Sequence, residues 1–152
     1  MSPLGKVVVA MRRSIETIRV LVVDDSNLIR EALGNFVAEL PDMLVVGRAR
    51  DGQEALDLSP ALHPDVVVMD LRMPRLDGLG ATRVLKGEVE PPAVIICTTE
   101  DDDLTHRAAL DAGADAFLLK RDLGSRIEDV IRSLVAPSAA PGRARIRTGE
   151  GD

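Results

Sequence analysis

Five short apolar runs alternate with segments of helical periodicity along this chain, and no other feature restricts its possible folds so strongly. The runs cover residues 19–23, 44–48, 66–69, 93–98 and 116–119, and several are nearly continuous valine, isoleucine and leucine. Apolar strands without polar alternation are buried on both faces, as parallel strands are. Strict alternation of strands and helices therefore predicts an α/β fold, a doubly wound parallel sheet of five strands with five helices and right-handed crossovers.

Two of the helices are predicted from apolar stripes with helical spacing. The first stripe comprises Leu28, Ile29, Ala32, Leu33, Phe36, Val37 and Leu40, and the last comprises Ile127, Val130, Ile131 and Leu134. Ser26 or Asn27 is placed to cap the first of these helices. Both stripes are expected to face the sheet.

Breaker residues delimit two of the other three helices. One is predicted from residue 52 or 53 to residue 62, ended by His63 and Pro64, and another over 79–86, ahead of two prolines. The segment 104–112 is the least apolar of the set, so we expect this helix to be the most loosely held.

Composition narrows the class of protein. The 152 residues suit a single domain with a real core, and 45% hydrophobic with 29% charged residues is typical of a soluble globular chain. No apolar run approaches the roughly 18 residues of a membrane-spanning helix, and the run 7–11 is too short for a signal peptide. These features predict a cytoplasmic protein with no membrane partner.

Charge and aromatic content argue against direct binding of nucleic acid. The net charge is −6, and the chain has no Trp, no Tyr and only two Phe, so it lacks both a basic field and platforms for stacking bases. The single Cys97 lies within an apolar run and is interpreted as a small buried hydrophobe.

Polar residues collect at the carboxyl ends of the predicted strands. Asp24 and Asp25 follow the first strand, Asp70 follows the third, and Thr98 and Lys120 end the fourth and fifth. Ligands of doubly wound sheets bind at this edge. Two carboxylates about 4 Å apart repel by roughly 4 kcal/mol at an effective dielectric constant of 20, so the cluster is expected to recruit a cation. All-oxygen ligands favour Mg²⁺, and the set as a whole has the parts needed for phosphoryl transfer onto an aspartate.

Taken singly, each of these residues has a simpler interpretation. Asp24 and Asp25 are also consistent with a solvated strand end or a helix cap. Thr98 is consistent with an ordinary strand terminus, and Lys120 with a surface lysine. The acids at 101–103 are interpreted as capping residues at a helix N-terminus, and neither His63 nor His106 is a credible catalytic base. Only the joint placement at one sheet edge favours a functional site.

With these residues in place, the chain resembles the receiver domain of two-component response regulators over residues 18–135. Asp24 and Asp25 resemble the family's acidic pair, and Asp70 its phosphoacceptor. Thr98 and Lys120 match the hydroxyl residue and the lysine that end the fourth and fifth strands. The turn after the acceptor is matched by Pro74 and Gly78, and the aromatic switch position by Phe117. The resemblance implies a flavodoxin-like sheet of strand order 2-1-3-4-5.

The resemblance also implies a mechanism. Asp25, Asp70 and the backbone carbonyl of Arg72 would bind Mg²⁺ directly, and Asp24 mainly through a water molecule. A sensor histidine kinase or a phosphotransfer protein would supply the phosphoryl group. Thr98 would then move toward it and Phe117 would repack, altering the face formed by the fourth helix, fifth strand and fifth helix. An unknown downstream protein would bind this face. The resemblance also allows for a homodimer that depends on phosphorylation.

Two departures from the family pattern affect these expectations. Lys120 precedes Arg121 where most of the family has proline, so the cis peptide common at that bond is not expected here. The segments 40–47 and 118–122 resemble receivers that precede a helix-turn-helix output domain, and no such domain is recognisable in this chain.

Residues 1–17 are expected to form a flexible extension, in which Met11 is an alternative start, and residues 136–152 a disordered tail.

Three functions of different classes remain open. The leading one is a stand-alone receiver that signals by contact and catalyses only its own phosphorylation and dephosphorylation. The second is the receiver of a transcription regulator whose DNA-binding domain is missing. The third is a phosphatase with Asp70 as nucleophile, although the second acid of comparable phosphatases is replaced by Arg72. We also expect Arg72 and Glu100 to pair over the acceptor and to slow the access of water.

Overall fold

The computed structural model describes residues 17–135 and confirms the predicted alternation of strands and helices. The strands are β1 (Ile18–Val23), β2 (Met43–Ala49), β3 (Val66–Asp70), β4 (Ala93–Thr98) and β5 (Ala116–Leu119). The helices are α2 (Asn27–Ala38), α3 (Gly52–Leu62), α4 (Gly78–Lys86), α5 (Asp103–Asp111) and α6 (Leu123–Leu134), with a 3-10 turn η1 (Lys120–Asp122) before α6. The flexible extension predicted for residues 1–17, apart from residue 17, and the disordered tail predicted for residues 136–152 lie outside the described residues.

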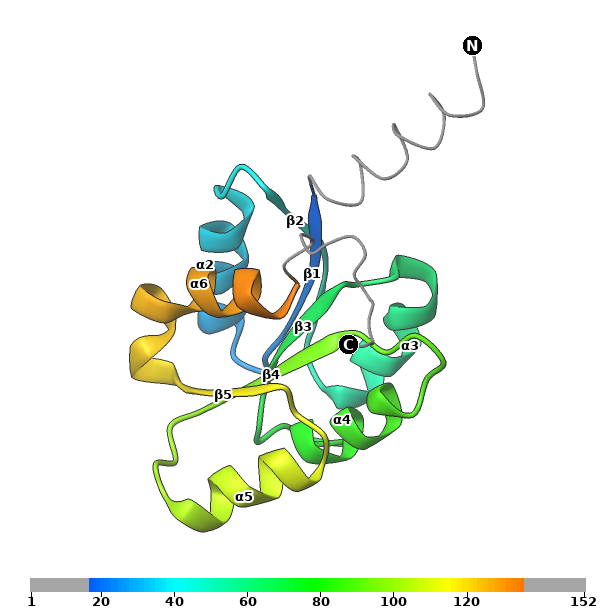
Figure 1. Ribbon diagram of the computed structural model, residues 1–152, viewed down its shortest axis with the longest axis vertical. Coiled ribbons are helices and arrows are strands. Elements are labelled where there is room, and N and C mark those ends of the chain that lie inside the picture. Colours follow the sequence, from blue (N-terminus) through cyan, green and yellow to red (C-terminus); the bar gives the residue numbers. More distant parts are fainter. Residues whose placement is uncertain (1–16, 136–152) are drawn as a thin grey trace, which may run out of the picture.

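All five strands are parallel and belong to one sheet of order β2-β1-β3-β4-β5 (Figure 1). The strand order reverses beside β1, since β2 lies on one side of it and β3 on the other. The doubly wound fold and the flavodoxin-like order are therefore confirmed. Because every strand runs the same way, all five carboxyl ends lie at one edge of the sheet.

Two apolar cores separate the sheet from its helices. Along β1, Val20 and Val22 face one core and Leu21 and Val23 the other, and all four are fully buried. Helices α2 and α6 cover the first core, and α3, α4 and α5 cover the second (Figure 1). Burial on both faces is why these strands are continuously apolar.

Four of the five described helices, α2 to α5, start at a side-chain cap. Ser26 rather than Asn27 caps α2, and its hydroxyl accepts a hydrogen bond from the backbone N–H of Ile29. Asp102 caps α5 and Asp103 lies in its first turn, as the capping interpretation predicted, whereas Asp101 is paired with Arg121. At the end of α3, His63 adopts the left-handed conformation with φ of 48°, just before Pro64. No helix within residues 17–135 is long and apolar enough to cross a membrane.

The apolar stripe of α2 is wider than the face that the helix buries. Leu33 and Val37 pack against the core as predicted, but Leu28 is 79% exposed and Phe36 is 38% exposed. Helical periodicity therefore identified the helix correctly and overestimated its buried face. In α5, by contrast, only Ala109 is buried, as its polar composition suggested.

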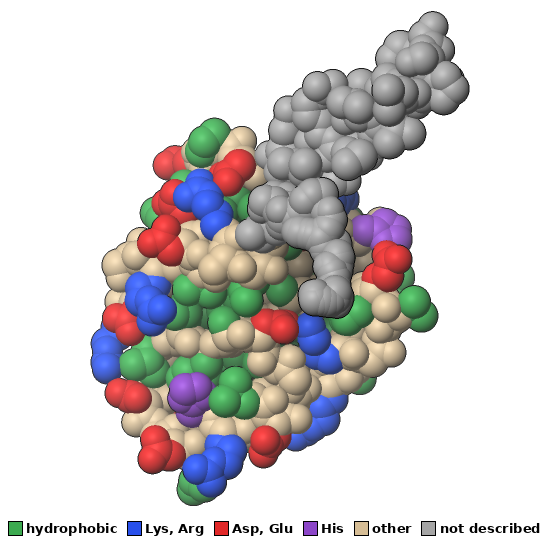
Figure 2. Space-filling view, viewed as in Figure 1, with side chains coloured by type: hydrophobic (Ala, Val, Ile, Leu, Met, Phe, Trp, Pro, Cys, Tyr) green, Lys and Arg blue, Asp and Glu red, His purple; other side chains and the backbone are tan. Residues whose placement is uncertain are grey.

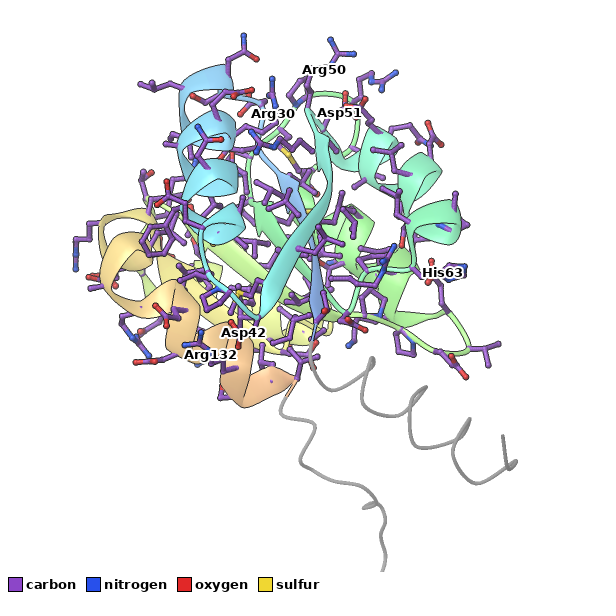
Figure 3. All side chains as sticks on the ribbon, turned by 90° about the horizontal axis from the view of Figure 1, so that it is seen from above. Arg30, Asp42, Arg50, Asp51, His63 and Arg132 are labelled. Atoms are coloured by element: carbon purple, nitrogen blue, oxygen red, sulfur yellow. The ribbon has the colours of Figure 1, made fainter. Side chains whose placement is uncertain are left out.

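An ion pair joins α6 to the loop before β2. The guanidinium of Arg132 donates two hydrogen bonds of 2.8 Å to the carboxylate of Asp42, and the two side chains point toward each other in Figure 3. The hydrogen bond from Arg132 lowers the pKa of Asp42, against a smaller opposing effect of burial. This contact connects residues that are 90 positions apart in the sequence.

Two leucines on neighbouring helices provide a matched test of the packing. Leu85 on α4 is completely buried, whereas Leu104 on α5 is 79% exposed. Leu85→Ala is expected to lower the free energy of unfolding by about 2 to 5 kcal/mol, because it leaves a cavity in the core. Leu104→Ala is expected to change it by less than about 0.5 kcal/mol. Urea denaturation followed by circular dichroism measures both, and equal losses would contradict the assigned burial.

Candidate functional site

Three carboxylates meet at the carboxyl edge of the sheet. The last paired residues of β1 and β3, Val23 and Met69, directly precede Asp24 and Asp70. Oxygen atoms of Asp24, Asp25 and Asp70 all lie within 4.8 Å of one another. Asp24 and Asp70 are buried, at 3% and 6% exposure, while Asp25 is exposed. The convergence predicted from the sequence is therefore present in the fold.

Lys120 supplies the positive charge at this cluster. It follows β5, and its Nζ lies 3.1 Å from an oxygen of Asp24 and 3.1 Å from an oxygen of Asp70. One ammonium opposes three carboxylates, so with every carboxylate ionised the cluster carries an excess of negative charge. Such an excess in a partly buried site favours a bound cation or protonation of one acid.

Burial perturbs the ionisation of this cluster. The pKa of Asp70 is raised to about 6, mainly by desolvation and then by the charge of Asp24, while Lys120 offsets part of both effects. Desolvation alone would lower the pKa of Lys120, but its hydrogen bonds to Asp70 and Asp24 outweigh this and the pKa is raised. Asp70 is thus an acid with an unusually high pKa beside a lysine that stays protonated.

Asp24 is held in place by the start of α2. Its carboxylate accepts a hydrogen bond of 2.9 Å from the backbone N–H of Ser26. Its backbone carbonyl accepts another, of 2.8 Å, from the guanidinium of Arg30. These two hydrogen bonds hold the carboxylate and the backbone of Asp24 in place beside Asp70.

Thr98 lies at the same edge, one strand away from Asp70. The register pairs Cys97 with Asp70, so Thr98 follows at the end of β4. Its buried hydroxyl accepts a hydrogen bond of 3.1 Å from the backbone N–H of Glu100. Cys97 itself is buried, as predicted, and burial raises the pKa of its thiol. Within the described residues no peptide bond is cis, in agreement with the sequence at Lys120 and Arg121.

The pair that the sequence suggested between Arg72 and Glu100 forms across two loops. Arg72 follows β3, and its guanidinium donates two hydrogen bonds to the carboxylate of Glu100, which follows β4. The second of these bonds is 2.8 Å long. Hydrogen bonding to Arg72 lowers the pKa of Glu100. The two loops that flank Asp70 are thereby linked by a bidentate ion pair.

The turn after Asp70 requires glycine at position 78. A Cβ atom there would lie only 2.4 Å from the backbone oxygen of Asp70. The backbone N–H of Gly78 also donates a hydrogen bond of 2.8 Å to the carbonyl of Leu71. The start of α4 is therefore packed directly against the backbone of Asp70, with Pro74 exposed in the intervening loop.

Sequence reasoning missed a second support of this loop. Arg75 has a positive φ of 69° and donates two hydrogen bonds, of 2.9 and 3.1 Å, to the carboxylate of Asp51. That carboxylate also caps α3, and the hydrogen bond from Arg75 lowers its pKa. The pair Asp51 and Gly52 before a helix was a recognisable cap signal, but nothing in the sequence pointed to a partner 24 positions away.

Other polar features lie away from this cluster. His63 lines a groove of about 810 Å³ at the opposite, amino-terminal edge of the sheet, and Figure 3 places it far from Asp51. On the face drawn in Figure 2, acidic and basic side chains are interspersed and form no continuous basic patch. Neither histidine contributes to the acidic cluster, and the prediction that neither is a catalytic base remains a prediction.

Fold and site together define a class: a doubly wound α/β protein with a partly buried carboxylate cluster and a lysine at the carboxyl edge of its sheet. The sequence matches the family of the response regulator receiver domain over residues 20–132. The chain belongs to this family. Receiver domains of this kind accept a phosphoryl group from histidine kinases.

Two curated proteins illustrate the relationship. The chain is 40% identical to the transcriptional regulatory protein LiaR of Bacillus subtilis over 116 residues, which are 76% of this chain and 55% of that protein. It is 46% identical over 106 residues to protein-glutamate methylesterase/protein-glutamine glutaminase 4 of Myxococcus xanthus, covering 69% of this chain and 30% of that protein. The chain thus spans about half or less of the length of these relatives.

Solved structures agree with the fold. The response regulator domain of Thermotoga maritima CheB matches with a TM-score of 0.74 and 35% identity, covering 80% of this chain and 98% of that one. The signal receiver domain of the putative response regulator NarL from Mycobacterium tuberculosis matches with a TM-score of 0.70 and 33% identity, covering 77% and 98%.

The raised pKa of Asp70 predicts a pH-dependent gain in stability on removing its charge. In the absence of divalent cations, protonated Asp70 favours the folded state, and this contribution is lost as the pH rises from about 4 through 6. Asp70→Asn does not titrate, so its stability relative to wild type should increase by about 1 to 3 kcal/mol between pH 5 and pH 7.5. Urea denaturation with EDTA at the two pH values measures this change. A constant difference between the proteins would contradict it.

Proposed function

We propose that this protein is a phosphorylation-controlled receiver, in which Asp70 accepts a phosphoryl group with the help of Mg²⁺. The observation that carries the proposal is the position of Lys120, whose ammonium contacts both Asp24 and Asp70 at the carboxyl edge of the sheet. A buried carboxylate with a fixed ammonium beside it is suited to receive a group that carries negative oxygens.

The residues present fit a magnesium ion. The cluster offers only oxygen ligands and an excess of negative charge, and hard Mg²⁺ prefers both. Asp25, Asp70 and the backbone carbonyl of Arg72 would hold the ion, and Asp24 would act mainly through a bound water. When bound, the ion supplies positive charge that offsets the charge on phosphoryl oxygens.

The proposed reaction transfers the phosphoryl group from a phosphohistidine. A carboxylate oxygen of Asp70 forms a bond to phosphorus as the phosphorus–nitrogen bond breaks. The electron pair of that bond remains on the histidine nitrogen, and an acyl phosphate is left on Asp70. Lys120 offsets the charge on the transferring oxygens, because its ammonium already contacts the Asp70 carboxylate.

The phosphorylated state would be read out by Thr98 and Phe117. The Thr98 hydroxyl would leave the N–H of Glu100 and turn toward the phosphoryl group, and Phe117 would repack toward the space it leaves. The affected surface is the one formed by α5, β5 and α6. In chain order these are the fourth helix, the fifth strand and the fifth helix of the domain. A downstream protein or a second copy of the chain would bind there.

The signalling mode that we favour is a stand-alone receiver, phosphorylated by a sensor histidine kinase or a phosphotransfer protein. A second candidate is the receiver part of a transcription regulator, and the 40% identity to LiaR supports it. A phosphatase is disfavoured, because the position two residues after Asp70 holds Arg72, whose guanidinium is engaged by Glu100. Under both receiver functions, this domain catalyses only its own phosphorylation and dephosphorylation.

Intact-mass analysis tests the acceptor directly. Incubation with a small phosphodonor and Mg²⁺ is expected to add one phosphoryl group to the wild type and none to Asp70→Asn, because the amide is not a nucleophile. Asp101→Asn is a matched control, since this exposed acid follows β4 but lies outside the cluster. Labelling of Asp70→Asn, or sustained turnover of phosphate esters by the wild type, would contradict the proposal.

The pair formed by Arg72 and Glu100 is expected to prolong the life of the acyl phosphate by restricting the approach of water. Arg72→Ala should shorten the phosphoryl half-life by about 2- to 5-fold, the range expected for a largely exposed ion pair. Decay of the phosphorylated mass after removal of the donor measures the half-life.

A double-mutant cycle provides the control for this effect. Glu100→Ala should shorten the half-life as much as Arg72→Ala does, and the double variant should show no further loss. Equal half-lives in the wild type and Arg72→Ala would exclude a shielding role for the pair.

A further inference from the structure

Helix α5 is attached to the sheet by few apolar contacts. Ala109 is the only buried residue within the helix. Both leucines of α5 point away from the core, with exposures of 79% for Leu104 and 51% for Leu110. Individual contacts to α5 therefore carry a larger share of its attachment than they do in the other helices.

One of these contacts is an aromatic stack between α5 and β5. The imidazole of His106 lies over the ring of Phe117 with centroids 4.6 Å apart and an angle of 12° between the ring planes. His106 is largely exposed, and Phe117 is half-buried against the core beneath α3, α4 and α5. The chain contains only two His, two Phe and no Trp or Tyr, so this stack joins half of its aromatic rings.

The stacked ring lies on the same face of the sheet as Thr98. The register pairs Ile96 with Phe117 and Thr98 with Leu119. Side chains two residues apart on a strand share a face, and so do directly paired residues of parallel strands. Thr98 and Phe117 therefore both lie on the face of the sheet that α3, α4 and α5 cover, and α5 carries His106.

The residue before His106 belongs to the loop network around the acceptor. The hydroxyl of Thr105 lies 3.4 Å from the carboxylate of Glu100, which also binds Arg72. The backbone N–H of Glu100 in turn contacts the hydroxyl of Thr98. Helix α5 is thus linked to the acceptor edge through Thr105 and to the switch position through His106.

We propose that His106 is a positioning residue that latches the ring of Phe117 in the unphosphorylated orientation. This inference rests on the proposed function, in which Phe117 repacks after phosphorylation of Asp70. Repacking of Phe117 breaks the stack, so the contact stabilises only the unphosphorylated state. A contact made in one of two states shifts their equilibrium by its full free energy.

The expected size of the effect follows from the strength of aromatic pairs. Such pairs contribute about 0.5 to 1.5 kcal/mol beyond their buried area, which corresponds to about a 2- to 12-fold change in an equilibrium constant. His106→Ala should therefore tighten the binding of a phosphoryl mimic by about this factor. General loosening of α5 would weaken binding or leave it unchanged, so the sign separates a latch from a merely structural role.

Binding of beryllofluoride in the presence of Mg²⁺ measures this equilibrium without covalent chemistry. Dissociation constants are compared for the wild type, His106→Ala, His106→Phe and Arg107→Ala. We expect tighter binding in His106→Ala, and wild-type affinity in His106→Phe, which keeps a ring for the stack. Arg107→Ala, a change at the next exposed position of α5, should also bind as the wild type does. Unchanged or weaker binding by His106→Ala overturns the latch.

Aromatic proton NMR of the same samples follows the ring itself. With so few aromatic residues, the signals of Phe117 can be assigned by comparison with Phe117→Leu. In the wild type these signals should lose the ring-current shift caused by His106 when beryllofluoride saturates the site. Saturation without a change at Phe117 overturns the latch and leaves the acceptor role of Asp70 intact. Failure of the wild type to bind beryllofluoride and to accept a phosphoryl group overturns both proposals.

Discussion

The contact of one ammonium with two buried carboxylates is the constraint on which the functional edge of this protein depends. Lys120 reaches Asp24 and Asp70 at 3.1 Å each, although the three residues end three different strands. Such a contact requires β1, β3 and β5 to run parallel and to end at the same level. The two apolar cores make that arrangement stable, since each strand is buried on both faces.

The carboxylate cluster carries more negative charge than Lys120 can neutralise. One lysine opposes three carboxylates, and the pKa of Asp70 rises to about 6 because its charged form is desolvated and repelled by Asp24. The loops around these acids are closely packed. Gly78 packs against the backbone of Asp70, and Arg75 binds Asp51 at the start of α3. Stability is thus given up at the site where a cation and a phosphoryl group are proposed to bind.

The loops around Asp70 form one connected network with α5. Glu100 binds Arg72 across the carboxyl edge of the sheet and contacts Thr105 on the helix, while His106 stacks on Phe117. Because α5 itself buries little apolar surface, these polar and aromatic contacts have a large influence on its position. Under the proposed function, α5 is the element through which a change at Asp70 would reach the surface.

Local sequence determined the strands, the helix limits and the residues at the strand ends, because hydrophobic period, caps and breakers act over a few residues. It also suggested the pair of Arg72 and Glu100, since both flank strand ends that meet. Contacts between distant segments were decided only by the tertiary structure. Packing set which part of the α2 stripe is buried, and left Leu28 and Phe36 exposed. The contacts of Arg75 with Asp51 and of His106 with Phe117 depend on how loops and helices settle over the sheet, which no local pattern encodes.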